Sequence, residues 1–255
     1  MAQSFTSDDL QALASYPFKD ANWKNKFLIG GLVSFLGYII PLVPWFVFYG
    51  YGAQIMRRVI IEETEPFLPE WDDWGKLFTD GIKPVGVGFV YTLPIWLVFG
   101  VGYSFFFAAI FIGATAGAGS DSPPAWLVFL PMFAGLGFTA TIGVGALLGL
   151  ALGVFMPVVI AHVIATDDFA AAFRFNECWS LFRANVSGFT SSYFLLVALG
   201  IGLGFVMQIL YFTIIGCCLL PFILPFFSYY MMLIWSVIFG RAYRVAVQQL
   251  KLSPA

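Results

Sequence analysis

The sequence predicts an all-α protein, a polytopic bundle of transmembrane helices with amphipathic helices at the membrane interface. Hydrophobic residues make up 60% of the 255 residues and charged residues only 10%, whereas an ordinary globular domain carries about 25% charged residues. The charges are also grouped, because long uncharged runs alternate with short polar stretches. These runs cover residues 27–56, 84–119, 123–166 and 184–240. We therefore expect lipid, rather than water, to surround most of the chain.

The three later runs supply four membrane helices. About 20 apolar residues span the roughly 30 Å hydrocarbon core of a bilayer, and longer segments fit by tilting. A cluster of Gly, Ser, Asp and Pro at residues 117–124 separates the first two helices, because a lipid-exposed helix does not tolerate such a cluster. Gly216 marks the turn of the second pair. The expected helices are 84–116, 125–163, 188–214 and 218–242.

The first run, residues 27–56, is long for one crossing and short for two. Gly37, Pro41 and Pro44 lie near its centre and favour a turn there. Lys and Arg concentrate on the cytoplasmic side of short loops. A single crossing would separate the three N-terminal lysines from the other nine positive residues, whereas a short hairpin leaves all 12 on one side. We therefore favour the hairpin over one helix, with both termini cytoplasmic.

Three polar stretches are predicted to form interfacial helices, at residues 7–23, 62–81 and 167–186. Apolar and aromatic residues recur in them at helical spacing while charges fall on another face, which is typical of helices in the headgroup plane. The second stretch is expected to end at Asp80-Gly81. In the third, Arg174 and Glu177 have the spacing of an i, i+3 pair.

The second interfacial stretch carries an acidic cluster. Its members are Glu62, Glu63, Glu65, Glu70, Asp72 and Asp73. Carboxylates could hold Ca²⁺ or Mg²⁺, but the regular spacing and central glycine of a calcium loop are missing. We favour a solvated surface that faces a partner. Arg57 and Arg58 are expected to pair with Glu62 and Glu65 at helical distance.

The stretches also suggest a three-fold internal repeat. Trp71–Phe78 aligns without gaps to Phe175–Phe182, and each is followed by an uncharged run. The implied unit is one interfacial helix followed by a membrane hairpin, with the first hairpin shortened. Chance matching of aromatic and acidic residues is the alternative, since such internal signals are weak.

Several functional classes are disfavoured by composition. The 12 Lys and Arg nearly balance the 14 Asp and Glu, so no basic excess is available to bind nucleic acid. The three cysteines lack metal-ligand spacing. Within the expected membrane segments the only Asp, Glu, Lys or Arg is Arg241, which weighs against a proton-driven pump or an intramembrane enzyme. We therefore expect no catalytic residue, metal or cofactor.

The lone histidine, His162, lies near the end of an expected membrane helix. It could ligate a haem or chlorophyll among the 30 phenylalanines of the chain. A single histidine more often has a structural role, and we prefer that interpretation.

A stripe of small residues follows the long helix expected at 125–163. It consists of Gly137, Thr141, Gly145, Gly149 and Gly153, four residues apart. Small side chains at this spacing let helix backbones approach closely, which drives helix association in lipid. We expect a helix interface here. Packing within one subunit is the preferred interpretation, and packing between two copies of the chain is the alternative. Gly200 and Gly204 on the next helix are the expected mate.

The residues from Gly50 to Gly81 carry a resemblance. Gly50-Tyr51, Arg57 and the run Leu68–Gly81, which reads LPEWDDWGKLFTDG, resemble the signature of a prokaryotic family of uncharacterised multi-pass membrane proteins of unknown function. The layout is also similar to the membrane domain attached to some glycerophosphodiester phosphodiesterases. The resemblance implies a location in a prokaryotic cell membrane and an architecture, but no activity.

Two functions remain in view. The first is a non-enzymatic scaffold or accessory subunit that contacts the lipid bilayer and a membrane-protein partner or second copy. The residues expected to make those contacts are Glu70, Trp71, Asp72, Asp73, Trp74 and Trp179. The alternative is a carrier or channel for a neutral or lipidic solute. Its path would use polar side chains such as Gln54, Thr92, Ser104, Thr139 and Gln208.

Overall fold

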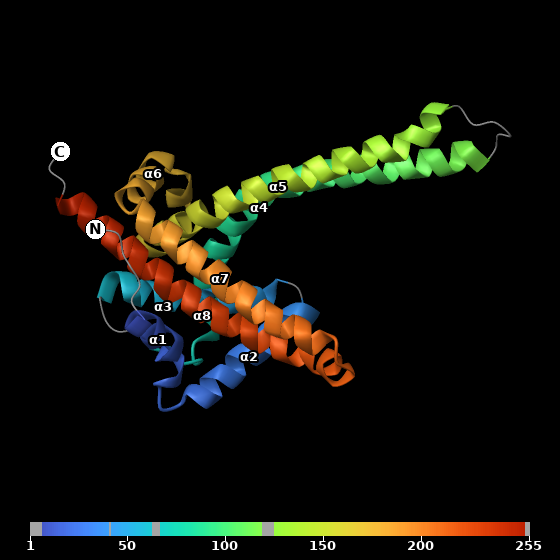
Figure 1. Ribbon diagram of the computed structural model, residues 1–255. Coiled ribbons are helices and arrows are strands. Elements are labelled where there is room, and N and C mark those ends of the chain that lie inside the picture. Colours follow the sequence, from blue (N-terminus) through green and yellow to red (C-terminus); the bar gives the residue numbers. More distant parts are fainter. Residues whose placement is uncertain (1–6, 41, 63–66, 119–124, 253–255) are drawn as a thin grey trace. The chain divides into compact units, whose positions relative to one another are not determined.

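A computed structural model describes residues 7–40, 42–62, 67–118 and 125–252, and every regular element in these ranges is helical (Figure 1). The predicted all-α class is therefore confirmed. In chain order the elements are α1 (Ser7–Ser15), η1 (Tyr16–Phe18), α2 (Trp23–Ile39), α3 (Val43–Arg57), η2 (Arg58–Glu62), α4 (Trp74–Ala118), α5 (Ala125–Thr166), η3 (Phe169–Phe173), α6 (Phe175–Ala184), α7 (Val186–Tyr211) and α8 (Ile214–Leu252).

Four of the described helices are long and apolar enough to cross a membrane. These spans are Trp74–Ala116, Phe129–Thr166, Val186–Tyr211 and Cys218–Lys251. Their length and composition are those of a membrane protein.

The chain forms two compact units, one made of residues 1–88 and 154–255 and the other of residues 89–153. In the larger unit α8 is the central helix and packs against α2, α3, α6 and α7. Its buried face contributes Tyr229, Leu233, Ile234, Val237, Ile238 and Phe239, each at most 1% exposed. Gly30 and Gly31 of α2 lie directly under the Tyr229 and Phe226 rings, where any Cβ atom would clash. Glycine at these two positions therefore lets α2 approach α8 closely.

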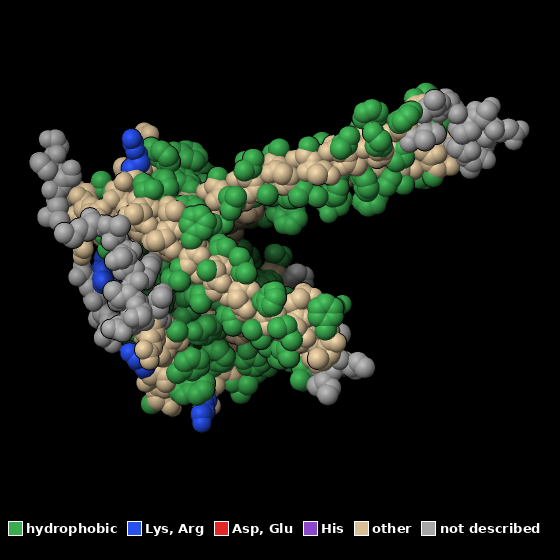
Figure 2. Space-filling model, in the orientation of Figure 1, with side chains coloured by type: hydrophobic (Ala, Val, Ile, Leu, Met, Phe, Trp, Pro, Cys, Tyr) green, Lys and Arg blue, Asp and Glu red, His purple; other side chains and the backbone are tan. Residues whose placement is uncertain are grey.

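The smaller unit, residues 89–153, is a hairpin of the second part of α4 and the first part of α5. Thr141 packs on Gly102, and the Phe99 ring packs on Gly145. Hydrophobic side chains are exposed along the length of this hairpin, beside backbone and other residues (Figure 2). Among them, Phe111 is 70% exposed and Trp96 is 67% exposed. Side chains of this kind are suited to contact with lipid or with another apolar surface.

Residues 27–56 are divided between two helices, α2 and α3, which pack against each other. Ile40 is extended and ends α2. Leu42, just before α3, has φ of 77°, a conformation that non-glycine residues rarely adopt within a helix. A proline lies in the first turn of α3, where its missing N–H costs nothing. Whether this pair enters the bilayer, and on which side the termini lie, stay predictions.

The expected interfacial helix at residues 62–81 is wrong in both of its bounds. Residues 67–73 are not helical, and α4 begins only at Trp74. The backbone carbonyls of Leu68 and Pro69 instead accept hydrogen bonds from Lys26 and Tyr51. At the other end α4 continues through Asp80-Gly81 without a break, because Gly81 is where α4 crosses α3 and no helix end is required there.

The expected helix at 167–186 is two pieces, η3 and α6, separated at Arg174 (φ −82°, ψ 70°). Asp168 caps η3 by accepting a hydrogen bond from the Ala170 N–H and also pairs with Arg174. This pairing competes with a continuous helix. The expected Arg174–Glu177 pair is present, at 3.7 Å.

The remaining differences are at helix ends. α8 runs to Leu252 rather than 242, since Tyr243 and Ala246 are still buried in the core beyond the apolar run. The expected turn at 117–124 falls mainly on residues 119–124, outside the described part. The aligned motifs of the internal repeat also differ, because Trp71–Asp73 is not helical whereas Phe175–Phe182 lies within α6. The repeat itself stays a prediction.

Candidate functional site

Lys26, in the first turns of α2, is the centre of the first polar cluster. Its side chain is only 6% exposed. The ammonium group donates to Asp20 Oδ2 at 2.8 Å and to the Leu68 carbonyl at 2.8 Å, and it lies 2.6 Å from Glu70 Oε1. An ammonium has three protons, so all three are engaged. Lys26 therefore ties the turn before α2 to the segment that precedes α4.

The pKa values in this cluster follow from its hydrogen bonds. Burial by itself raises the pKa of Asp20, but hydrogen bonds from Lys26 and from the Asn22 backbone outweigh it, so that the pKa lies below its usual value. Burial likewise lowers the pKa of Lys26, and the contacts with Asp20 and Glu70 more than reverse this. Both groups are held in their charged forms at neutral pH.

An aromatic stack lies beside Lys26. Tyr51 of α3 and Trp71 are stacked with ring centroids 4.1 Å apart, and Tyr229 of α8 contacts both rings. The Tyr51 hydroxyl donates to the Pro69 carbonyl at 2.9 Å, and Trp71 Nε1 donates to the Lys26 carbonyl at 3.2 Å. Residues 67–73, which we call the docked segment, are therefore fixed to α2, α3 and α8 by stacking and by hydrogen bonds to their backbone.

Two glycines let α3 and α4 cross in contact beneath the docked segment. A Cβ atom added at Gly50 would overlap the Leu77 carbonyl oxygen, and one added at Gly81 would overlap the Phe46 carbonyl oxygen. Both neighbours are backbone atoms, which cannot move aside as a flexible side chain can. Only glycine at both positions permits this crossing.

A second polar cluster joins α3, α4 and the end of α5. Arg57 lies 3.4 Å from Asp80 Oδ1 and 3.0 Å from Asp167 Oδ1, and Lys83 lies 2.7 Å from Asp167 Oδ1. Asp167 has φ of 56°, a left-handed conformation that Asp tolerates better than most residues. The hydrogen bond from Lys83 is the main cause that lowers the pKa of Asp167. Arg57 thus pairs with Asp80 and Asp167, while the side chains of Glu62 and Glu65 lie outside the described part.

The third cluster surrounds His162, which is 7% exposed. Its Nδ1 lies 2.9 Å from the Tyr243 hydroxyl and its Nε2 lies 3.1 Å from Glu177 Oε2. Arg174 contacts the same Glu177 carboxylate. Both ring nitrogens therefore have partners within the chain, and a haem or chlorophyll would have to displace one of them. The cluster joins α6 to α5 and α8.

The comparison with known proteins supports one part of the resemblance noted from the sequence, membership of an uncharacterised family. The model of a family described as a protein of unknown function (DUF4013) matches residues 33–216. The chain belongs to this family. Comparison with curated proteins and with solved structures gives no significant match. The DUF4013 region includes the C-terminal part of α2, together with α3, the docked segment and α4 to α7.

Within the DUF4013 region, the motif that carried the resemblance proves to be one structural unit. Gly50 and Gly81 form the helix crossing, Tyr51 stacks on Trp71, and Arg57 pairs with Asp80. The spacing of these residues in sequence gave no indication of this, because their contacts cross about 20 to 30 positions of the chain and depend on the tertiary fold.

The residues expected at a partner-facing surface divide into two groups. Trp71 is only 8% exposed, so its expected place at the surface is wrong. Asp73 accepts a hydrogen bond from the Lys76 N–H and so caps α4. Asp72 is exposed, as are Trp74 (46%) and Trp179 (51%). Glu70 keeps a side chain that is 63% exposed although it pairs with Lys26.

The stripe of small residues on α5 contacts α4 within the smaller unit. Gly137 lies near the Phe105 ring, Thr141 packs on Gly102 and Gly145 packs on Phe99. An added Cβ at Gly149 meets nothing within 4 Å, and the same holds for Gly200 and Gly204 of α7. The pairing of this stripe with Gly200 and Gly204 of α7 stays a prediction, since α7 belongs to the other compact unit. Gly153 marks the end of the smaller unit.

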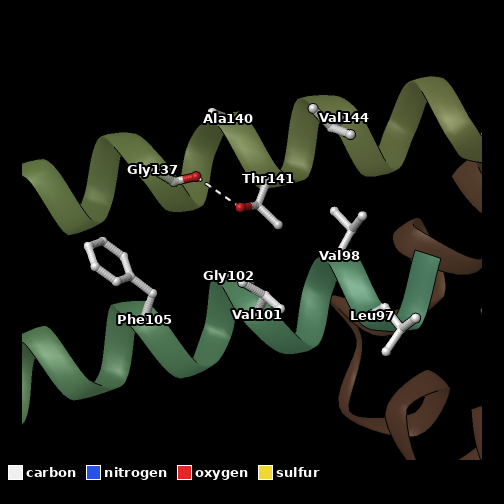
Figure 3. A pocket seen from close by; sticks show the side chains of 9 residues that line it. All are labelled: Leu97, Val98, Val101, Gly102, Phe105, Gly137, Ala140, Thr141 and Val144. Carbon is white, nitrogen blue, oxygen red and sulfur yellow. Dashed lines mark hydrogen bonds between the residues drawn. The ribbon is translucent and has the colours of Figure 1, made fainter. Parts of the chain in front are cut away.

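Two pockets are of interest. The first, about 540 Å³, lies within the α4/α5 hairpin and is lined by Leu97, Val98, Val101, Gly102, Phe105, Gly137, Ala140, Thr141 and Val144 (Figure 3). Its only hydroxyl, on Thr141, is already bonded to the Gly137 carbonyl at 2.9 Å. The second, about 270 Å³, lies between α2 and the docked segment. Among the described residues no group of three or more His, Cys, Asp or Glu side chains is placed to hold a metal.

Proposed function

We propose that this DUF4013 protein is a non-enzymatic integral membrane scaffold or accessory subunit. Its role is to present a fixed set of side chains at the membrane interface to lipid and to a membrane-protein partner in a prokaryotic cell membrane. The arrangement of its charges is the observation that carries the proposal. Lys26, Arg57 and His162 each join segments that are distant in sequence, so the clusters serve to hold the fold.

The same clusters offer little to a catalytic mechanism. General acid–base or nucleophilic catalysis needs a group that is free to exchange a proton with a substrate. Lys26 has three partners, and each ring nitrogen of His162 has one. Cys178 is buried, and burial raises the pKa of its thiol to about 11, which suppresses the nucleophilic thiolate. These states suit a structural role.

An exposed aromatic surface on η3 and α6 is the best candidate for partner contact. Phe169, Phe173 and Trp179 are 39%, 44% and 51% exposed. Trp179 is held in place by ring contacts with Phe155 and Phe182, so little side-chain entropy is lost on binding. A rigid tryptophan at an interface is a common source of binding energy.

The test is purification in a mild detergent from native membranes. We expect a stoichiometric partner that is lost in Trp179→Ser while the thermal midpoint is unchanged. Trp126→Ser is the matched control, because Trp126 is 59% exposed and contributes nothing to the η3/α6 surface. Retention of the partner by the Trp179 variant, or equal loss in both variants, would exclude this surface.

The apolar pocket of the hairpin favours a second function, carriage of a lipidic solute. Its lining is almost wholly apolar and includes a glycine on each helix. Liposome flux tests it. Ala140→Phe would fill the pocket, whereas Ala151→Phe adds the same ring to an exposed position outside it. Lipid or neutral-solute flux blocked only by the first variant would favour the carrier over the scaffold.

A further inference from the structure

The pocket between α2 and the docked segment is polar and small. It is lined by Asn22, Asn25, Lys26, Ile29, Glu70, Trp71 and Asp72. Its volume of about 270 Å³ lies below the roughly 300–1,000 Å³ of pockets that hold drug-sized ligands. A volume of this size suits a small group, such as a substituent of a lipid headgroup.

The charged side chains of the lining indicate whether the bound group is a cation or an anion. Lys26 is the only cation of the lining, and its three protons are engaged by Asp20, Leu68 and Glu70. It therefore has no donor left for an anion. Asp72 forms no ion pair within the described residues, and its Oδ1 accepts only the Asp73 N–H. Glu70 is largely exposed, and its Oε1 contacts Lys26. The oxygens available to a ligand are acceptors.

The aromatic geometry distinguishes between kinds of cation. A quaternary ammonium is bound by the open faces of several aromatic rings. Here Trp71 is the only aromatic side chain of the lining. Tyr51 covers one face of the Trp71 ring, with centroids 4.1 Å apart. The Trp74 ring also contacts Trp71, with centroids 5.7 Å apart. Carboxylates and the side-chain amides of Asn22 and Asn25 surround the remaining space. This lining suits a group that donates hydrogen bonds.

We propose that this pocket binds a primary ammonium group, through charge-assisted hydrogen bonds to Asp72 and Glu70. Its position favours a lipid source such as an ethanolamine headgroup. The pocket lies at the first turn of α2, next to Trp23 and Trp74, and tryptophans of this kind lie at headgroup level. The choice of a lipid as the ligand rests on the proposed membrane role. The ammonium site itself does not, since a free amine would have the same chemistry.

Binding is measured on the full-length protein in detergent, by native mass spectrometry and by the shift of the thermal midpoint. The probes are phosphatidylethanolamine, phosphatidylcholine, phosphatidylglycerol and free ethanolamine. We expect saturable binding of phosphatidylethanolamine in preference to the other two lipids. Free ethanolamine binding as tightly as the lipid would support the ammonium site and assign it a soluble ligand. Equal binding of the three lipids together with no ethanolamine binding would overturn the proposal.

Two neighbouring carboxylates provide the matched variants. Asp72→Asn removes a charge from the lining but keeps the oxygen that accepts the Asp73 N–H, and we expect about tenfold weaker phosphatidylethanolamine binding from the loss of one charged hydrogen bond. Asp73→Asn removes the same charge one residue outside the lining, and Asn caps a helix as well as Asp does. Equal weakening in both variants, or none in Asp72→Asn, would contradict the proposal. Neither variant changes Trp179, so partner binding is tested separately.

Discussion

Tyr51 and Trp71 lie face to face, with ring centroids 4.1 Å apart and an angle of 9° between the ring planes. Tyr51 is fully buried in α3, and Trp71 belongs to a segment that has no helix of its own. The stack therefore supplies the docked segment with the contacts that regular structure would otherwise provide.

Shortening the Tyr51 side chain separates its two contributions. Tyr51→Phe removes the hydrogen bond to the Pro69 carbonyl and should cost about 1 kcal/mol of unfolding free energy. Tyr51→Ala removes the ring as well and should cost about 3–5 kcal/mol. The measurement is denaturant unfolding in detergent, followed by tryptophan fluorescence. Equal effects of the two variants would show that the stack contributes nothing.

Removing the charge of Lys26 should lower the free energy of unfolding more than removing the charge of Lys24. Lys26→Met leaves the partly buried Asp20 carboxylate and the Leu68 carbonyl without their partner, which should destabilise the fold by about 2–3 kcal/mol. Lys24 is exposed and makes only a contact with the Trp23 ring, at 5.9 Å. Lys24→Met should therefore stay within about 0.5 kcal/mol of the wild type. A Lys26 variant as stable as the Lys24 variant would contradict this account.

Acid should destabilise the fold through Asp20 and Asp167. Both carboxyls have pKa values below their usual range in the folded chain. A carboxyl whose pKa is lower when folded contributes stability above its unfolded pKa, and the contribution is lost as the pH falls through the folded pKa. The thermal midpoint in detergent should therefore stay level from neutral pH to about pH 4 and then fall.

Alkali should also destabilise the fold, through Lys26, whose pKa is raised in the folded chain. Its contribution is complete below the unfolded pKa, near 10.4, and is lost as the pH rises through the folded value. In Asp167→Asn the thermal midpoint should fall less steeply below about pH 4 than in the wild type, while its fall in alkali is unchanged. A midpoint that rises on acidification below pH 4 would exclude the assignment of these charged pairs.

The sequence was sufficient for the long helices but not for the segment between α3 and α4. Hydropathy places α4, α5, α7 and α8 because transfer into lipid depends on the composition of each run by itself. The docked segment has helix-compatible aromatic spacing, yet Lys26 and Tyr51 bind its carbonyls across 42 and 18 positions of the chain. The spacing of apolar residues within 62–81 therefore does not predict these long-range hydrogen bonds.

The glycines show the same limit at the level of packing. The α5 stripe was correctly expected to be small enough for close contact, but small side chains carry no information about which helix will cover them. The packing role of Gly50 and Gly81 was not predictable in this way, because each is isolated rather than part of a repeated spacing. Gly81 was instead interpreted as a helix end, since glycine after a charged residue is common there.

His162 provides the last prediction, and it concerns a single proton. In a neutral imidazole one nitrogen donates a hydrogen bond and the other accepts one. The Glu177 carboxylate facing Nε2 only accepts, whereas the Tyr243 hydroxyl facing Nδ1 is able to donate. The neutral ring should therefore carry its proton on Nε2.

The chain has one histidine, so nitrogen NMR of the imidazole in mildly alkaline buffer reports this site alone. We expect the Nε2–H tautomer in the wild type and in Glu177→Gln, whose amide oxygen still accepts. Glu177→Ala removes the acceptor and should shift the population toward the Nδ1–H form. A wild-type spectrum dominated by the Nδ1–H form would mean that Glu177 does not orient the ring, and that α6 is held to α5 by packing alone.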